Sequence, residues 1–361
     1  MNARAKSAMS KPFLSAQAIT TPRFDLIATS GLSIFVMIGL LIYYIVADPA
    51  RSDAGEHILP KLLVLQVLLN WPHFLVSYRL LYGRKDNFKD YPAATKYVPA
   101  ILLAICVLGM LPLTGGAGPL QYSISLAYPM WVFAALYLAW HYTGQTWGVM
   151  MSFARLSGLK LSETERLLLR NGLRIMIAWH VVWGLQTLPQ QPFLSLLQSV
   201  EAMNIINIAA ILAFAVGAAT LGRRFVLDGG MDLRVIGAWC VLYLWYLVLF
   251  LMPDAFMFIQ LSHSLQYMIF PARVELNEHA DSAKTVPAQA KRLGLIYGLA
   301  VLGGLVIFYL PDFMFASPTG APTLAALLGI SVNIHHYYAD SAIWKLRTKR
   351  VQGSLFSHLS K

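Results

Sequence analysis

The segment Ser331–Lys345 carries an amide, an imidazole and a carboxylate at the spacing of one helical face. Asn333, His336 and Asp340 stand at positions i, i+3 and i+7, so a helix would place all three on the same side. His335 lies about 100° around that helix and would face a different neighbour. Ionisable side chains inside apolar segments are costly, and they usually face the interior of a helical bundle, where they bind or react with something. The segment therefore indicates the centre of a polar, metal-binding site.

Other apolar segments carry histidines with polar neighbours at helical spacing. They hold Gln66, Asn70, His73 and Ser77, then His141 with Gln145, then His180, and then Gln260, His263 and Tyr267. We expect the metal ligands to come from His73, His141, His180, His263, His335, His336 and Asp340. Amide side chains can hold an imidazole through its second nitrogen, so Asn70, Gln145 and Asn333 are expected to orient the ligands. Tyr267 is expected to hydrogen-bond bound oxygen or substrate as a catalytic residue.

A structural role for these histidines is the competing interpretation. A single histidine in a transmembrane helix is often only a hydrogen-bonding group between helices. Six histidines on five predicted spans are harder to explain in this way, because each buried imidazole needs a partner of its own. If the site is real, the side chains of His141, His263, His336 and Asp340 should converge within roughly 10 Å.

The composition is that of a polytopic membrane protein. Of the 361 residues, 57% are hydrophobic and 12% are charged, and the mean hydropathy is +0.58. A bilayer admits only helices or closed barrels, and the apolar segments are too long and uniform for barrel strands. We therefore expect an all-α transmembrane helical bundle. Cys106 and Cys240 both lie in apolar segments, so neither a disulfide framework nor a cysteine metal site is indicated.

The apolar segments and the basic residues between them predict a topology. About ten spans are expected, near residues 26–47, 60–82, 97–114, 126–151, 172–188, 203–221, 235–252, 255–272, 293–310 and 322–344. Basic residues crowd into alternate connections, whereas Arg51 is the one basic residue in the others. The positive-inside rule then places both termini in the cytoplasm and all six histidines in the cytoplasmic half of the membrane.

These features define three expected regions. Residues 1–25 form a basic cytoplasmic tail, 26–345 a single transmembrane bundle, and 346–361 a second basic cytoplasmic tail. The net charge of +11 is explained by topology and by anionic membrane lipids, so no nucleic-acid partner is needed. We expect an integral multi-pass protein of a bacterial inner membrane.

The histidines also carry a resemblance at the level of protein class. With the pair His335-His336, the chain resembles the histidine-rich membrane oxygenases, namely the lipid desaturases and hydroxylases and the carotenoid-cleaving oxygenases. Their repeated His-x-x-His-His runs are absent. The resemblance implies a non-haem iron site, with one iron or two, supplied by histidines near the cytoplasmic face. The run His263-Ser-Leu-Gln-Tyr267 ahead of the histidine pair is similar to an arrangement in the haem-copper oxidases, but their other haem ligands have no counterpart here.

The expected function is that of a membrane-bound, iron-dependent oxidoreductase. Imidazoles without thiolates suit iron, copper or zinc, and a membrane-buried centre is most easily reached by a hydrophobic lipid, isoprenoid or quinone-like substrate. The sequence indicates no particular electron donor. Two other classes use the same residues: a b-type haem protein with two axial histidines, and a proton- or ion-coupled transporter with a relay at mid-membrane.

Overall fold

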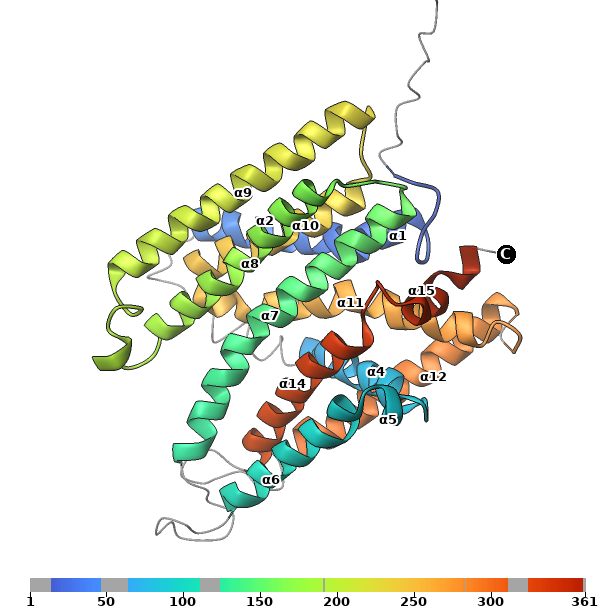
Figure 1. Ribbon diagram of the computed structural model, residues 1–361. Coiled ribbons are helices and arrows are strands. Elements are labelled where there is room, and N and C mark those ends of the chain that lie inside the picture. The colour runs from blue at the N-terminus through green and yellow to red at the C-terminus, as the bar shows by residue number, and fades with distance from the viewer. Residues whose placement is uncertain are drawn as a thin grey trace, which may run out of the picture. The chain divides into compact units, whose positions relative to one another are not determined.

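The computed structural model describes residues 14–46, 64–110, 124–190, 192–282, 284–310 and 324–359 (Figure 1). Every regular element among them is a helix, which confirms the all-α prediction. The chain divides into two compact units, each assembled from separate stretches of sequence. The first contains Met1–Val46 and Tyr142–Ala255, and the second contains Ala47–His141 and Phe256–Lys361. The predicted boundaries at residues 25 and 345 stay a prediction.

The first unit is built from one short helix and several long ones, whose ends are set by local signals. They are α1 (Pro22–Leu26), α2 (Leu32–Val46), the second part of α7 (Ile124–Leu156), α8 (Glu163–Gln186), α9 (Val200–Asp228) and α10 (Leu233–Leu251). The Ser162 side chain caps α8 while Glu165 bonds back to the Ser162 backbone. Gly229, with a φ of 67°, ends α9. Gly217 of α9 lies against the Trp239 ring of α10, where any larger residue would clash.

A buried ionic network ties the residues before α1 to the start of α10. Arg234 has no exposed surface, and its guanidinium lies 2.6 Å from Asp232 and 3.3 Å from Asp25. It also donates to the carbonyl oxygens of Ser15 and Gln17. Buried charges persist when they are paired and hydrogen-bonded. Part of the region expected as a basic tail is thus an integral piece of the first unit.

The second unit contains α4 (Trp71–Tyr82), α5 (Asn87–Asp90), α6 (Val98–Met110), the first part of α7, α11 (Phe256–Glu278), α12 (Val286–Gly304), α14 (Leu324–Ile343) and α15 (Lys349–Phe356). Three π-helical turns belong to it, and one of them, Gln66–Asn70, leads directly into α4. Turns of this kind are rare in proteins, and those that occur are often found at functional sites. Residues 346–361, expected as a tail, include α15.

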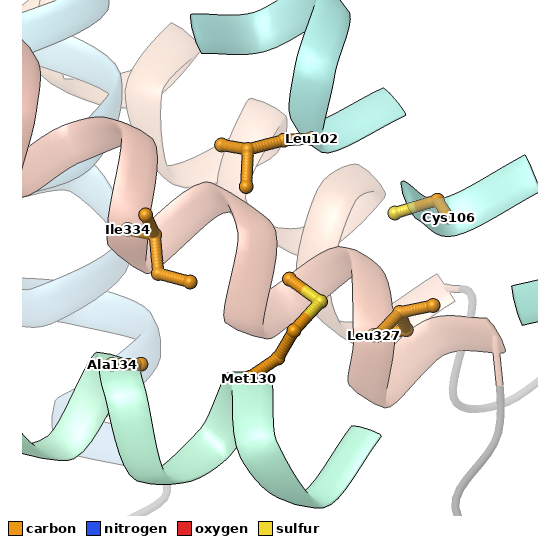
Figure 2. Close-up of a cluster of buried hydrophobic side chains, with 6 residues drawn as sticks. All are labelled: Leu102, Cys106, Met130, Ala134, Leu327 and Ile334. Carbon is orange, nitrogen blue, oxygen red and sulfur yellow. The ribbon is translucent and has the colours of Figure 1, made fainter. Parts of the chain in front are cut away.

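An apolar cluster fixes the position of α14 in this unit (Figure 2). Its buried members are Leu327 and Ile334 from α14, Leu102 and Cys106 from α6, and Met130 and Ala134 from α7. Figure 2 shows the side chains of α14 pointing toward those of the two neighbouring helices. In water, burying an aliphatic side chain stabilises the fold by roughly 1.5–3 kcal/mol. In a bilayer, the close packing of such side chains stabilises the contact between helices. The cluster therefore holds the helix that carries His336.

Four helical segments in the described part of the chain are long and apolar enough to cross a membrane. They are Pro22–Val46, Val200–Asp228, Leu233–Leu251 and Val286–Tyr309. None of the four carries a histidine of the predicted site, whereas the helices with those histidines are interrupted by polar residues. Each of the ten predicted spans overlaps a described helix. The count of ten and the cytoplasmic position of the termini stay predictions.

Candidate metal centre

Four histidines from four helices of the second unit form one compact group. His73 lies on α4, His141 on α7, His263 on α11 and His336 on α14. Each offers a ring nitrogen, and these four atoms all lie within 4.8 Å of one another. Their exposed fractions run from 0% to 5%. The expected convergence of histidines from separate spans is therefore present, and it includes His73.

The rings pack edge to face around a common centre. The Nε2 atoms of His141 and His263 are 2.9 Å apart. The ring centroids of His73 and His336 lie 4.4 Å apart, and those of His141 and His336 lie 4.8 Å apart. Nitrogen ligands bind an ion at about 2 Å, so ligands of one ion lie about 3–4 Å from each other. Small side-chain rotations would bring all four nitrogens onto a single ion.

Hydrogen bonding within the described residues leaves part of this group unsatisfied. Both ring nitrogens of His336 and Nε2 of His73 are buried without a hydrogen-bond partner. A neutral imidazole offers one donor and one acceptor, and each buried polar group left unpaired costs about 1–3 kcal/mol. A bound ion would take one nitrogen from each imidazole, and the second nitrogen of His336 would then carry the proton. The group thus has the donor set of a metal centre, with buried nitrogens that an ion could bind.

Asp340 and Tyr267 lie at the His336 edge of the group. Oδ2 of Asp340 is 3.6 Å from Nε2 of His336, one helical turn away. The Tyr267 hydroxyl donates to Oδ1 of Asp340 at 3.2 Å, accepts from Nε1 of Trp344 at 2.9 Å, and lies 2.6 Å from the Ser77 hydroxyl. The Tyr267 hydroxyl thus has three protein partners, and its expected catalytic role stays a prediction.

Asn70 reaches the group through a residue that the sequence interpretation missed. Oδ1 of Asn70 accepts from the Ser264 hydroxyl at 2.9 Å, and that hydroxyl lies 3.5 Å from Nδ1 of His73. Ser264 also bonds to the carbonyl of Gln260 one turn earlier. The predicted inward polar stripe is confirmed, since Gln66, Asn70, His73 and Ser77 are all buried. Only the position of Ser264 next to His263 could have pointed to it.

Asn333 likewise contacts the four histidines through a neighbour, the aromatic residue Tyr337. Its Oδ1 accepts from the Tyr337 hydroxyl at 3.1 Å, and its Nδ2 donates to the carbonyl of Gly329. The Tyr337 ring stacks on the His141 ring at 4.8 Å and 27°. Tyr337 was not predicted, although its spacing of four residues from Asn333 was a usable signal.

Three other predicted residues lie outside the group of four. His335 faces a different neighbour, as its helical angle predicted: its Nε2 is 2.7 Å from the carbonyl oxygen of Ala94. His180 belongs to α8 of the first unit, where its ring meets Tyr246 edge-on at 5.7 Å. Gln145 lies on the part of α7 that belongs to the first unit. Their assigned roles stay predictions.

Comparison with known proteins adds no identification. No protein-family model matches this chain, and no curated protein or solved structure matches it either. The function must therefore be inferred from the chemistry of the site.

Proposed function

We propose that this chain is an integral-membrane oxidoreductase that uses non-haem iron held by His73, His141, His263 and His336. One observation carries the proposal: four buried imidazoles from four helices bring their ligand atoms within 4.8 Å of one another. A purely structural cluster is a poor explanation, because neither nitrogen of His336 has a hydrogen-bond partner among the described residues.

The donor set narrows the choice of metal. Imidazoles without thiolates suit iron, copper or zinc. Zinc bound by four side chains forms a closed tetrahedral site with no position for a substrate, whereas iron can accept further ligands and supports oxidative chemistry. One ion is favoured over two, because dinuclear iron sites in helical bundles use several carboxylates and Asp340 is the one carboxylate whose contact with the group is described.

A bare ion is better supported than haem. Two imidazoles on facing helices could serve as axial haem ligands. All four ligand atoms, however, lie within the same 4.8 Å, so two imidazoles would occupy the space that the macrocycle needs. The compact grouping favours an ion bound directly by the side chains.

The proposed substrate is a hydrophobic lipid, isoprenoid or quinone-like molecule, with dioxygen as the oxidant. Apolar groups wall the site: the Phe74 ring, 3% exposed, meets the His336 ring edge-on at 4.5 Å. On the same helix, Trp71 packs against Gly304 at the end of α12. Only 11% of the most apolar stretch of the segment Val286–Tyr309 is buried inside the protein. The exposed apolar side chains of this segment form a surface suited to contact with lipid. A lipid-soluble molecule would reach this centre without crossing water.

The reactions that such a centre could catalyse differ in the number of electrons that they need from an external donor. Oxidative cleavage that places both oxygen atoms in the products needs no outside electrons. Hydroxylation and desaturation each take two electrons from an external donor, and they return at least one oxygen atom as water. Oxygen uptake with and without an added reductant would distinguish these classes.

Metal analysis of the detergent-purified protein, together with its absorption spectrum, tests the proposal. We expect about one iron per chain and no haem Soret band. A Soret band would select the haem alternative, and stoichiometric copper or zinc would keep the site but replace the proposed metal. A protein that binds no transition metal after loading would overturn the proposal and favour a transporter that uses the same histidines.

A further inference from the structure

A small hollow lies in the second unit, away from the four histidines, and two arginines line it. It is formed by the end of α4, the residues around α5, and α15, with a cavity volume of about 40 Å³. A buried water needs roughly 10–15 Å³ of such space, so the hollow holds about three waters, comparable to the bulk of a phosphate group. Arg84 and Arg350 are the charged residues among its lining residues.

The two guanidinium groups are partly buried and close enough to repel each other. Their side chains are 30% and 29% exposed. Burial lowers the pKa of Arg84, and the nearby charge of Arg350 lowers it further. Each arginine also has an acidic partner, Glu278 for Arg84 and Asp90 for Arg350. Neither acid is among the lining residues, so the two charged side chains of the lining are both cationic.

Neutral groups complete an amphiphilic lining. The Ser354 hydroxyl accepts from Arg84 at 3.1 Å and keeps its own proton to donate. Leu80, Ile343 and Trp344 supply an apolar wall. Paired guanidinium groups with a hydroxyl are well suited to bind phosphate oxygens through charge-assisted hydrogen bonds.

The helix that closes the hollow, α15, is also bonded to α11. Nδ2 of Asn277 on α11 donates to the carbonyl oxygens of Ser354 and Leu355 at 2.9 and 3.0 Å. Arg350 lies on the same short helix, and its guanidinium lies 5.7 Å from the Tyr91 ring centroid. An anion held by both arginines would therefore join α15 to the end of α4.

We propose that this hollow is a binding site for a phosphate group, held between Arg84 and Arg350 and carried by an anionic phospholipid or by free phosphate. The site goes beyond the proposed oxidoreductase activity and does not depend on the metal. Its position between a short helix and a loop, with an apolar wall, fits the headgroup end of a lipid.

Native mass spectrometry and thermal unfolding of the full-length protein test the site, with phosphatidylglycerol, phosphatidylcholine and inorganic phosphate as separate probes. We expect retention of phosphatidylglycerol or phosphate, and a rise in unfolding temperature on adding it. Arg84→Gln and Arg350→Gln should each weaken that binding roughly tenfold or more, because each removes a charged hydrogen-bond donor. A response to phosphatidylglycerol but not to inorganic phosphate would identify a lipid, and a response to inorganic phosphate with no preference for phosphatidylglycerol over phosphatidylcholine would identify the free ion.

Variants of the two acidic partners show whether an arginine variant loses phosphate binding through its lost contact with the phosphate or through its broken ion pair. Glu278→Gln and Asp90→Asn break the same pairs but leave both arginines, so they should bind the probe as well as the parent or more tightly. Arg170→Gln, at an exposed position on α8, controls for loss of general positive charge. The proposal fails if the parent shows no preference over phosphatidylcholine and no response to phosphate. It also fails if Glu278→Gln loses binding as far as Arg84→Gln does.

Discussion

The Nε2 atoms of His141 on α7 and His263 on α11 lie 2.9 Å apart. At that distance the two imidazoles share a hydrogen bond, which is shorter than the spacing of about 3–4 Å between two nitrogens on one ion. A metal ion bound by both nitrogens would therefore break this bond and part the two rings slightly. The same closeness shows that α7 and α11 already hold the two rings near the spacing that a shared ion would need.

Asp340→Asn tests whether this carboxylate supports His336. The Asp340 side chain lies beside His336 without belonging to the group of four. Partners of this kind typically contribute 10–100-fold to metal affinity, so the dissociation constant should rise by about that factor. Competition with a chelator measures it. Complete loss of metal would make Asp340 a direct ligand, and an unchanged affinity would remove it from the site.

Ser264→Ala tests the link from Asn70 to His73. The Ser264 hydroxyl lies 2.9 Å from Asn70 and 3.5 Å from the His73 ring. Its removal should weaken metal binding by roughly 10–100-fold, because the ring loses the group that sets its orientation. Ser262→Ala is the matched control, since that serine is also buried on the same helix. Equal effects of the two changes would contradict the assignment.

The sequence predicted the main elements of the site for physical reasons. Polar groups in apolar helices turn inward because lipid cannot satisfy them. That rule correctly placed the stripe from Gln66 to Ser77 in the interior, and it anticipated that His141, His263 and His336 would meet. It needed only helical periodicity and hydropathy.

The same rule could not separate true neighbours from equally buried histidines. His335 and His336 are adjacent in sequence, but the partner of His335 is the Ala94 backbone carbonyl, which no side-chain pattern reveals. His180 is buried to the same degree as the four grouped histidines, at 4% exposed. Ser264 was missed because its contacts with Asn70 and His73 depend on how the helices pack rather than on spacing within one helix. The spacing of Tyr337 from Asn333 was a usable signal, but its stacking on the His141 ring depends on the same packing.

Removing Arg234 should strongly destabilise the first unit. Its guanidinium is fully buried between Asp25 and Asp232, and breaking a buried ion pair from one side costs about 3–5 kcal/mol. Arg234→Met should lower the free energy of unfolding by about that amount in denaturant titrations. Adding Asp25→Asn and Asp232→Asn to Arg234→Met should restore part of the loss, because the stranded carboxylates are neutralised. A single variant as stable as the parent would show that the network is dispensable.

The ion cluster at Glu275 should make stability depend on pH. Burial raises the pKa of Glu275, but hydrogen bonds from Arg79 and Arg292 outweigh it and hold the pKa below its ordinary value. A lowered pKa in the folded state stabilises the fold above the unfolded pKa of about 4.3, and this contribution disappears as the pH falls through the folded value. His279 also lies 3.2 Å from the carboxylate.

Glu275→Gln should therefore lower the unfolding temperature at pH 7, and the difference from the parent should shrink steadily below about pH 4. Thermal unfolding followed by circular dichroism at several pH values measures this. A difference that stays constant down to pH 3 would show that the carboxylate charge does not contribute to stability.

Metal content in two neighbouring histidine variants tests the central proposal most directly. His336 and His335 are adjacent on α14 and both buried, at 0% and 6% exposed, but only His336 belongs to the group of four. The measurement is the ratio of bound metal to protein in folded, detergent-purified His336→Gln, His335→Gln and parent proteins. We predict that His336→Gln loses the metal while His335→Gln keeps it at the parent ratio. Retention of metal by His336→Gln, or equal loss in both variants, would contradict a metal centre at these four histidines.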